Sequence, residues 1–80
     1  MIYFVAMPFT RIEEGGLAPG DAVECHGQGA AIRRAEAMSR DKANVGAVAF
    51  SRSGDPNLGE FEDAVILKAF GEVPEDFAEQ

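Results

Sequence analysis

The opening run of the chain, residues 2–9, constrains the fold more than any other feature. It is continuously apolar and rich in β-branched and aromatic residues, which is typical of a strand buried on both faces. Alternate side chains of a strand point to opposite faces, so Ile2, Phe4 and Ala6 would share one face and the residues between them the other. Pro8 cannot donate a hydrogen bond to a neighbouring strand, and we expect it to mark the strand's end or an edge position.

Residues 28–42 have the clearest helical pattern. They are rich in alanine, methionine and arginine, which are good helix formers. Ala31, Ala35 and Met38 recur at spacings of four and three and therefore lie on one stripe. Small residues on that stripe would let the helix approach a sheet closely.

Three other segments read as strands. Residues 45–51 are expected to form a central strand, and residues 22–25 a short strand that pairs back on residues 2–9 as a long-looped hairpin. Residues 61–70 fit both the helical and the strand pattern. Their β-branched pair at 65–66 and the length of the preceding loop favour a strand that forms a hairpin with residues 45–51.

Glycine and proline clusters mark the turns. Residues 13–16, 19–21 and 53–57 contain the residue types that turns require. Residues 74–77 are expected to start one short helical turn, with Phe77 docking on the body of the domain. In the alternative, the acidic tail at residues 72–80 frays.

The expected fold is an α+β domain of order β-β-α-β-β, a small, mainly antiparallel sheet with one helix packed on one face. Eighty residues make one domain, residues 1–80, rather than two. A single helix covers only about half of a four-stranded sheet, so we expect a second copy of the chain to cover the rest.

The charge balance narrows the class of partner. Fourteen acidic and seven basic residues give a net charge of −7, which repels the phosphates of nucleic acids and anionic lipids. We therefore expect no direct nucleic-acid partner and no membrane partner. The opening apolar run lacks a basic n-region and is too short to span a bilayer. With one cysteine no internal disulfide can form, and a cytoplasmic location is expected.

Cys25 and His26 are the obvious reactive side chains. Neighbours on a strand point to opposite faces, so the two do not readily pair as nucleophile and base. The start of the helix would favour a thiolate at Cys25 and disfavour a protonated His26. We interpret Cys25 as a half-buried packing residue and His26 as a loop residue. No catalytic residue and no cofactor is assigned, and no metal site either, because zinc takes at least three protein ligands.

The start of the helix is a candidate ligand site. Gly27 and Gly29 lead into it, and the backbone amides at a helix start can hold an anion. The dinucleotide fingerprint requires a third glycine where this chain has Ile32, and no P-loop lysine follows. Together with Arg33 and Arg34, the glycines predict a site for a small anion or an acidic peptide. In the alternative, the glycines serve a turn and an N-cap, and the arginines belong to a solvated helix face.

Acidic residues gather late in the chain. Residues 55–60 match only the beginning of a calcium-binding loop, so we interpret this group as favouring solubility and protecting a sheet edge. Arg52 is expected in the same loop, where it either joins the basic group of the helix or pairs with Asp55.

Three stretches resemble a pattern in short bacterial proteins of uncharacterised function. They are Ala-Val-Ala-Phe-Ser-Arg-Ser-Gly-Asp-Pro at 47–56, Gly-Glu-Phe at 59–61 and Phe-Gly-Glu-Val-Pro at 70–74. The Ala-Glu-Ala stretch at 35–37, in the expected helix, also fits the pattern. The resemblance covers roughly the last two-thirds of the chain. It implies no activity, and no functional residue is carried over from it.

The function predicted from the sequence is that of a small, non-enzymatic protein-interaction module that self-associates as a homodimer or binds another protein. One alternative is a domain that binds a small molecule or anion through the helix start. The other is an acidic decoy that inhibits a basic, nucleic-acid-binding protein.

Overall fold

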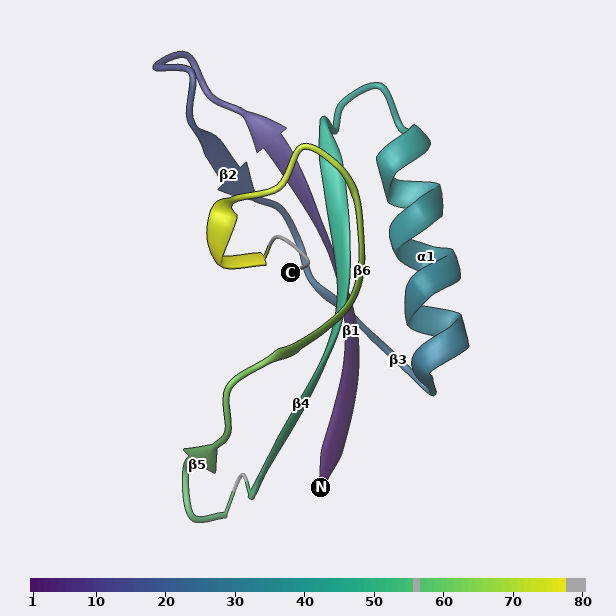
Figure 1. Ribbon diagram of the computed structural model, residues 1–80, viewed down its shortest axis with the longest axis vertical. Coiled ribbons are helices and arrows are strands. Elements are labelled where there is room, and N and C mark those ends of the chain that lie inside the picture. The colour runs from purple at the N-terminus through teal and green to yellow at the C-terminus, as the bar shows by residue number, and fades with distance from the viewer. Residues whose placement is uncertain (56, 78–80) are drawn as a thin grey trace.

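The computed structural model describes residues 1–55 and 57–77. Over these residues the chain is an α+β domain, in which one helix packs on a sheet whose strand pairs are all antiparallel (Figure 1). The predicted fold class is therefore confirmed. The elements are β1 (Ile2–Arg11), β2 (Leu17–Pro19), β3 (Val23–Cys25), α1 (Gln28–Arg40), β4 (Gly46–Asp55), β5 (Glu60–Phe61), β6 (Val65–Gly71) and the 3₁₀ turn η1 (Glu75–Phe77).

The sheet is built around the two long strands β1 and β4, which pair along most of their length. β2 and β3 lie one after the other along the outer side of β1, and β5 and β6 lie along the outer side of β4. The predicted hairpin of residues 22–25 with residues 2–9 is confirmed, because Phe4 lies opposite Cys25 and Ala6 opposite Val23. The favoured strand at residues 61–70 is also confirmed, in two pieces.

The expected position of Pro8 is wrong. Pro8 lies inside β1, opposite Ala47 of the neighbouring central strand β4. Its carbonyl oxygen accepts a hydrogen bond from the Gly20 amide (2.8 Å). The nitrogen and carbonyl of a strand residue face the same side, so the missing amide of Pro8 points at the break between β2 and β3, where no regular ladder runs.

Two element ends also differ from expectation. The helix ends at Arg40, two residues before the predicted end. The turn predicted at residues 53–57 begins later, because Ser53 pairs with Ile2 and Gly54 pairs with Phe61 in the extended end of β4. Cross-strand pairing on both sides thus outweighs the local turn preference of these residues. Pro56 lies outside the described residues.

One face of the sheet packs against α1 through alanine side chains. A cluster of fully buried alanines joins the two layers: Ala6, Ala47 and Ala49 from the sheet with Ala31 and Ala35 from the helix. The predicted alanine stripe therefore faces the sheet. Larger, partly buried side chains surround this cluster, among them Phe4, Ile32, Met38 and Phe70.

The other face carries the bulkier side chains. Phe9 and Val48 are fully buried there. The ring of Phe77 in η1 packs on this face, with its centroid 5.6 Å from that of Phe9 and 6.0 Å from that of Phe50. The predicted docking of Phe77 is confirmed, and η1 covers the part of the face around Phe9 and part of Phe50. Residues 78–80 of the predicted tail lie outside the described residues.

The path to η1 depends on two paired glycines. Gly71, the last residue of β6, has a φ of +68°, a conformation that glycine adopts without strain. The Glu72 backbone then crosses directly over Gly46, and its amide donates to the Val45 carbonyl (2.9 Å).

Among the described residues, α1 is too short and too polar to cross a lipid bilayer, and no other helix could do so.

Candidate functional site

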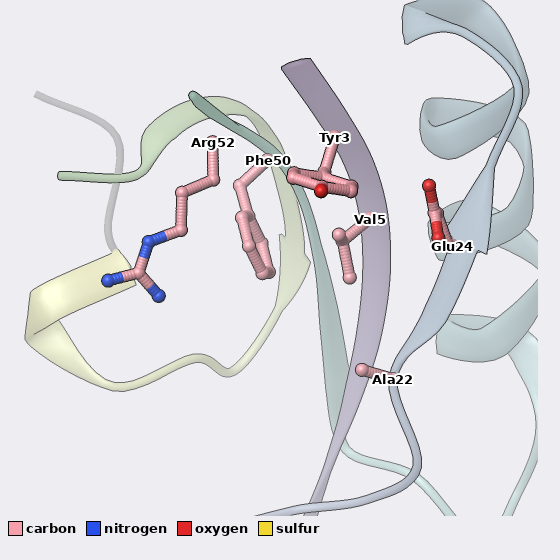
Figure 2. A pocket seen from close by; sticks show the side chains of 6 residues that line it. All are labelled: Tyr3, Val5, Ala22, Glu24, Phe50 and Arg52. Carbon is pink, nitrogen blue, oxygen red and sulfur yellow. The ribbon is translucent and has the colours of Figure 1, made fainter. Parts of the chain in front are cut away.

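A shallow hollow of about 390 Å³ lies on the sheet face away from α1. Its floor consists of Tyr3 and Val5 from β1 and Phe50 from β4 (Figure 2). Val5 pairs with Phe50 across the sheet, and paired residues of antiparallel strands project from the same face. The three floor side chains are half-buried, so the floor is apolar surface that the described residues leave partly open to solvent.

The hollow has charged residues of opposite sign on its two sides. Arg52 projects from β4 on one side and Glu24 from β3 on the other, with the apolar floor between them (Figure 2). Both are exposed. The Arg52 Nε donates to the Glu62 carbonyl (3.1 Å), which holds the guanidinium end of this side chain at the rim. Arg52 thus lies within β4 rather than in the predicted loop. Ala22, just before β3, completes the rim.

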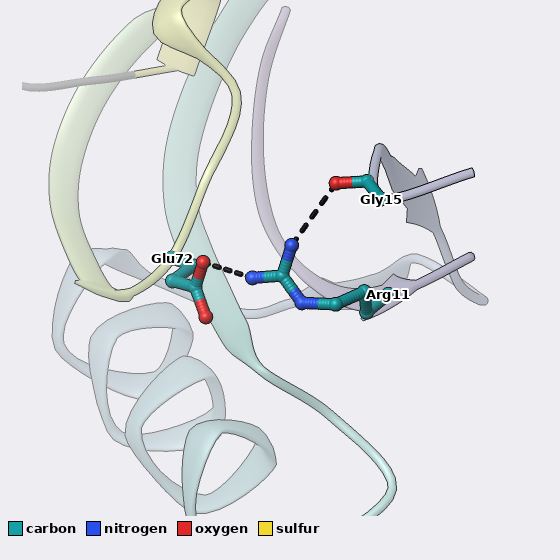
Figure 3. Close-up of polar contacts among 3 residues, drawn as sticks. All are labelled: Arg11, Gly15 and Glu72. Atoms are coloured by element: carbon teal, nitrogen blue, oxygen red, sulfur yellow. Dashed lines mark hydrogen bonds and ion pairs between the residues drawn. The ribbon is translucent and has the colours of Figure 1, made fainter. Parts of the chain in front are cut away.

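The segment that leads to η1 is anchored at the end of β1 that lies away from the hollow. Arg11, at the end of β1, forms an ion pair with Glu72 and donates a hydrogen bond to the Gly15 carbonyl (3.0 Å; Figure 3). The Arg11 hydrogen bond and its positive charge lower the pKa of the Glu72 carboxyl below its usual value. Together with the glycine turn, this contact directs η1 towards Phe9.

A second shallow groove, of about 420 Å³, runs between β3 and α1. It brings together four of the predicted site residues: Cys25, His26, Arg33 and Arg34. Val23, Glu24, Ala30 and Ala37 complete its lining.

The two predicted glycines do not line the groove. Gly27 is the N-cap of α1 in extended backbone (φ −170°), and a side chain there would point into open space. A Cβ at Gly29 would lie 3.2 Å from Nη1 of Arg33, so the Arg33 side chain folds back over the first turn of the helix. Neither glycine is therefore required by a tight turn. Gly27 is the N-cap residue, but it has no side chain with which to accept a hydrogen bond from the first turn of the helix.

Cys25 and His26 differ in environment. The Cys25 thiol is half-buried against the alanine cluster and donates to the Val23 carbonyl (3.7 Å). His26 is exposed in the bend between β3 and α1. Across the part of the chain that the structure describes, no group of three or more His, Cys, Asp and Glu side chains is arranged to hold a metal ion.

Part of the later acidic group gathers at the far end of the β4–β5 ribbon. Asp55, Glu60 and Glu62 line a hollow of about 490 Å³ there, together with Met1, Ser53 and Gly54. The Asp55 carboxylate accepts a hydrogen bond from the backbone amide of Asn57 (2.9 Å), as a turn-forming aspartate does. This carboxylate therefore stabilises the turn after β4.

The sequence predicts an uncovered part of the sheet but does not identify site residues on it. The floor residues could have been found from the alternation in residues 2–9 and 45–51, because this alternation places Tyr3, Val5 and Phe50 on the face opposite the alanines. The positions of Glu24 and Arg52 beside them depend on strand register, which alternation alone does not give.

The chain matches no protein-family model, no curated protein and no solved structure. The resemblance to short bacterial proteins therefore has no support from these comparisons.

Proposed function

We propose that this chain is a protein-interaction module that self-associates through the hollow face of its sheet. The observation that supports this proposal is the apolar floor of Tyr3, Val5 and Phe50 on the sheet face away from α1. The Phe77 ring of η1 contacts this floor at Phe50, and the described residues leave all three floor side chains half-buried. Aromatic residues and arginine are enriched in protein interfaces, where an apolar centre is surrounded by a polar rim. Two sheets packed face to face, about 10 Å apart, are a common way to bury such a surface.

The net charge bears on the class of partner, and the single cysteine bears on the redox state of the compartment. With a net charge of −7, we expect neither nucleic acid nor anionic membrane among the partners. A cytoplasmic, reducing setting is part of the proposal, and association is therefore measured with Cys25 kept reduced.

The rim substitution Ala22→Arg tests the proposal. Ala22 is exposed and lies outside the strands, so the domain should remain folded, while the added charge and bulk obstruct the hollow. We expect self-association of the wild-type chain in sedimentation equilibrium, weakened at least tenfold by this substitution.

The matched control is Ala37→Arg, which adds the same group to an exposed position on α1, away from the hollow. It should associate as the wild type does. A wild-type chain that stays monomeric at several hundred micromolar would overturn self-association. Equal weakening by both substitutions would show that the hollow is not the contact surface.

A second candidate function is the binding of a small anion in the groove between β3 and α1. The observation that favours it is the grouping of Arg33, Arg34 and His26 around one hollow. This hollow lies beside the first turn of α1, whose amides and dipole attract negative charge.

The substitution Gly27→Asp tests whether the groove binds an anion or whether its arginines only belong to a solvated helix face. The new carboxylate has open space and can cap α1, so we expect the unfolding free energy to rise by a few tenths of a kcal/mol. Its negative charge should weaken binding of inorganic phosphate or a nucleotide severalfold, measured by thermal shift.

Gly16→Asp, in the exposed hairpin turn, supplies the same charge as a control and should leave anion binding unchanged. No stabilisation of the wild type by phosphate, nucleotide or carboxylate ligands would eliminate the candidate. The acidic-decoy interpretation remains a prediction that depends on net charge alone.

A further inference from the structure

We infer that two copies of the chain pack around a two-fold axis through the hollow, so that Arg52 of each copy meets Glu24 of the other. The inference rests on the proposed self-association and adds its geometry. It follows from the arrangement of charges around the apolar floor.

The strand register places the charged residues on opposite sides of the floor. Glu24 on β3, Val5 on β1 and Phe50 on β4 form one row across the sheet. Arg52 lies on β4 opposite Tyr3, in the neighbouring row. From β3 to β4 across the hollow, a carboxylate is therefore followed by the apolar floor and then by a guanidinium (Figure 2).

This arrangement is complementary to itself. In a two-fold interface the same patch serves both copies, and each contact occurs twice. Rotation by half a turn about an axis that lies between the two sheets near Val5, parallel to β1, places the two floors face to face and exchanges the two sides of the hollow. The carboxylate side of each copy then faces the guanidinium side of the other.

The net charge of the molecule argues for the same pairing. Two copies that each carry −7 repel one another at distances within a Debye length. A stable approach therefore requires opposite charges at the contact itself. A cationic partner would match a surface of one sign, whereas this hollow presents both signs, one on each side.

The hollow is lined by six residues, far fewer than the roughly 20–30 residues per partner of a standard interface. Interfaces below roughly 1,200 Å² of total buried surface belong to weak or transient complexes. We therefore expect a dissociation constant in the micromolar range or weaker, and the measurements need to extend to about a millimolar concentration of chains.

The inference is tested by charge exchange between the two sides. Arg52→Glu gives a hollow with two negative sides, and Glu24→Arg gives one with two positive sides. Each variant alone should self-associate at least tenfold more weakly than the wild type in sedimentation equilibrium. An equimolar mixture of the two should form a heterodimer, because both cross-contacts are then between opposite charges.

The double variant R52E/E24R provides a second readout within one chain. Its two sides are exchanged rather than made alike, so it should recover self-association to within severalfold of the wild type. This variant also controls for any loss of folding caused by removing the Arg52 hydrogen bond to the Glu62 carbonyl, with circular dichroism as the check on folding.

The outcomes separate the inference from the proposed function. Wild-type self-association with no heterodimer in the mixture and no recovery in the double variant would overturn the two-fold pairing, while self-association would stand. A wild-type chain that is monomeric throughout, or single variants that associate normally, would overturn the pairing as well. Of these two results, only a wild-type chain that is monomeric throughout would also contradict the proposed self-association.

Discussion

Gly46→Ala is expected to destabilise the domain by about 3 kcal/mol or more, because the new methyl group has no space. An alanine Cβ there would lie 2.6 Å from both the carbonyl carbon and the amide nitrogen of Glu72, and closer still to the carbonyl oxygen. These atoms are backbone, so they can move only by separating the end of β6 from β4. Overpacking in a rigid site costs about 1–3 kcal/mol and sometimes more, and here the hydrogen bond from Glu72 to Val45 would also be lost.

That loss is large for a chain of this length. A domain of eighty residues has a total stability of roughly 4–12 kcal/mol. Urea unfolding followed by circular dichroism would measure the change directly. Since the Glu72 segment leads to η1, the Phe77 ring should also leave Phe9 and Phe50, which near-ultraviolet circular dichroism and binding of a hydrophobic dye would report.

Gly16→Ala is the matched control for this substitution. A methyl group at Gly16 would meet only the Ile12 side chain, at 3.5 Å, which is an ordinary contact. There the same chemical change should be neutral or stabilising by up to about 1 kcal/mol, because alanine restricts the unfolded chain. If Gly46→Ala unfolded at the same urea concentration as Gly16→Ala, the close passage of the Glu72 backbone over β4 would be contradicted.

The sequence was sufficient to predict the features that depend on local pattern. The alanine spacing in residues 28–42 identified the helix and its buried stripe, and alternation in residues 2–9 assigned the two faces of the first strand. Both patterns follow from the geometry of a single element, with periods near 3.6 and 2. The docking of Phe77 was predictable for a similar reason, since a proline preceded a short polar turn that ended in a large aromatic residue.

The features that were missed depend on contacts between distant segments. Pro8 is accommodated in a central strand because the opposing edge is interrupted at Gly20, and this interruption is not visible in residues 2–9. Ser53 and Gly54 extend β4 because Ile2 and Phe61 pair with them. The hollow was missed for the same reason, because its charged sides come from β3 and β4 and meet only through their common neighbour β1.

Ala35→Leu is the second substitution for which we expect a large effect. Ala35 is fully buried between α1 and the sheet, in contact with a layer that is itself made of alanines. Three additional carbon atoms cannot fit without lifting the helix from β1 and β4, and such overpacking costs about 1–3 kcal/mol. Leucine and alanine are both good helix formers, so the change in stability would report packing rather than helix propensity.

Thermal unfolding gives the measurement, and Ala37→Leu gives the control. A loss of about 2 kcal/mol should lower Tm by roughly 8–16 °C in a domain of this size. Ala37 lies two residues further along the same helix and is exposed, so leucine there should change Tm by no more than a few degrees. Because the alanine layer sets the distance between helix and sheet, Ala35→Leu should also disturb the half-buried Cys25 and raise its reactivity towards a thiol reagent. An unchanged Tm together with an unchanged reaction rate of Cys25 would show that α1 does not pack closely on the sheet through Ala35.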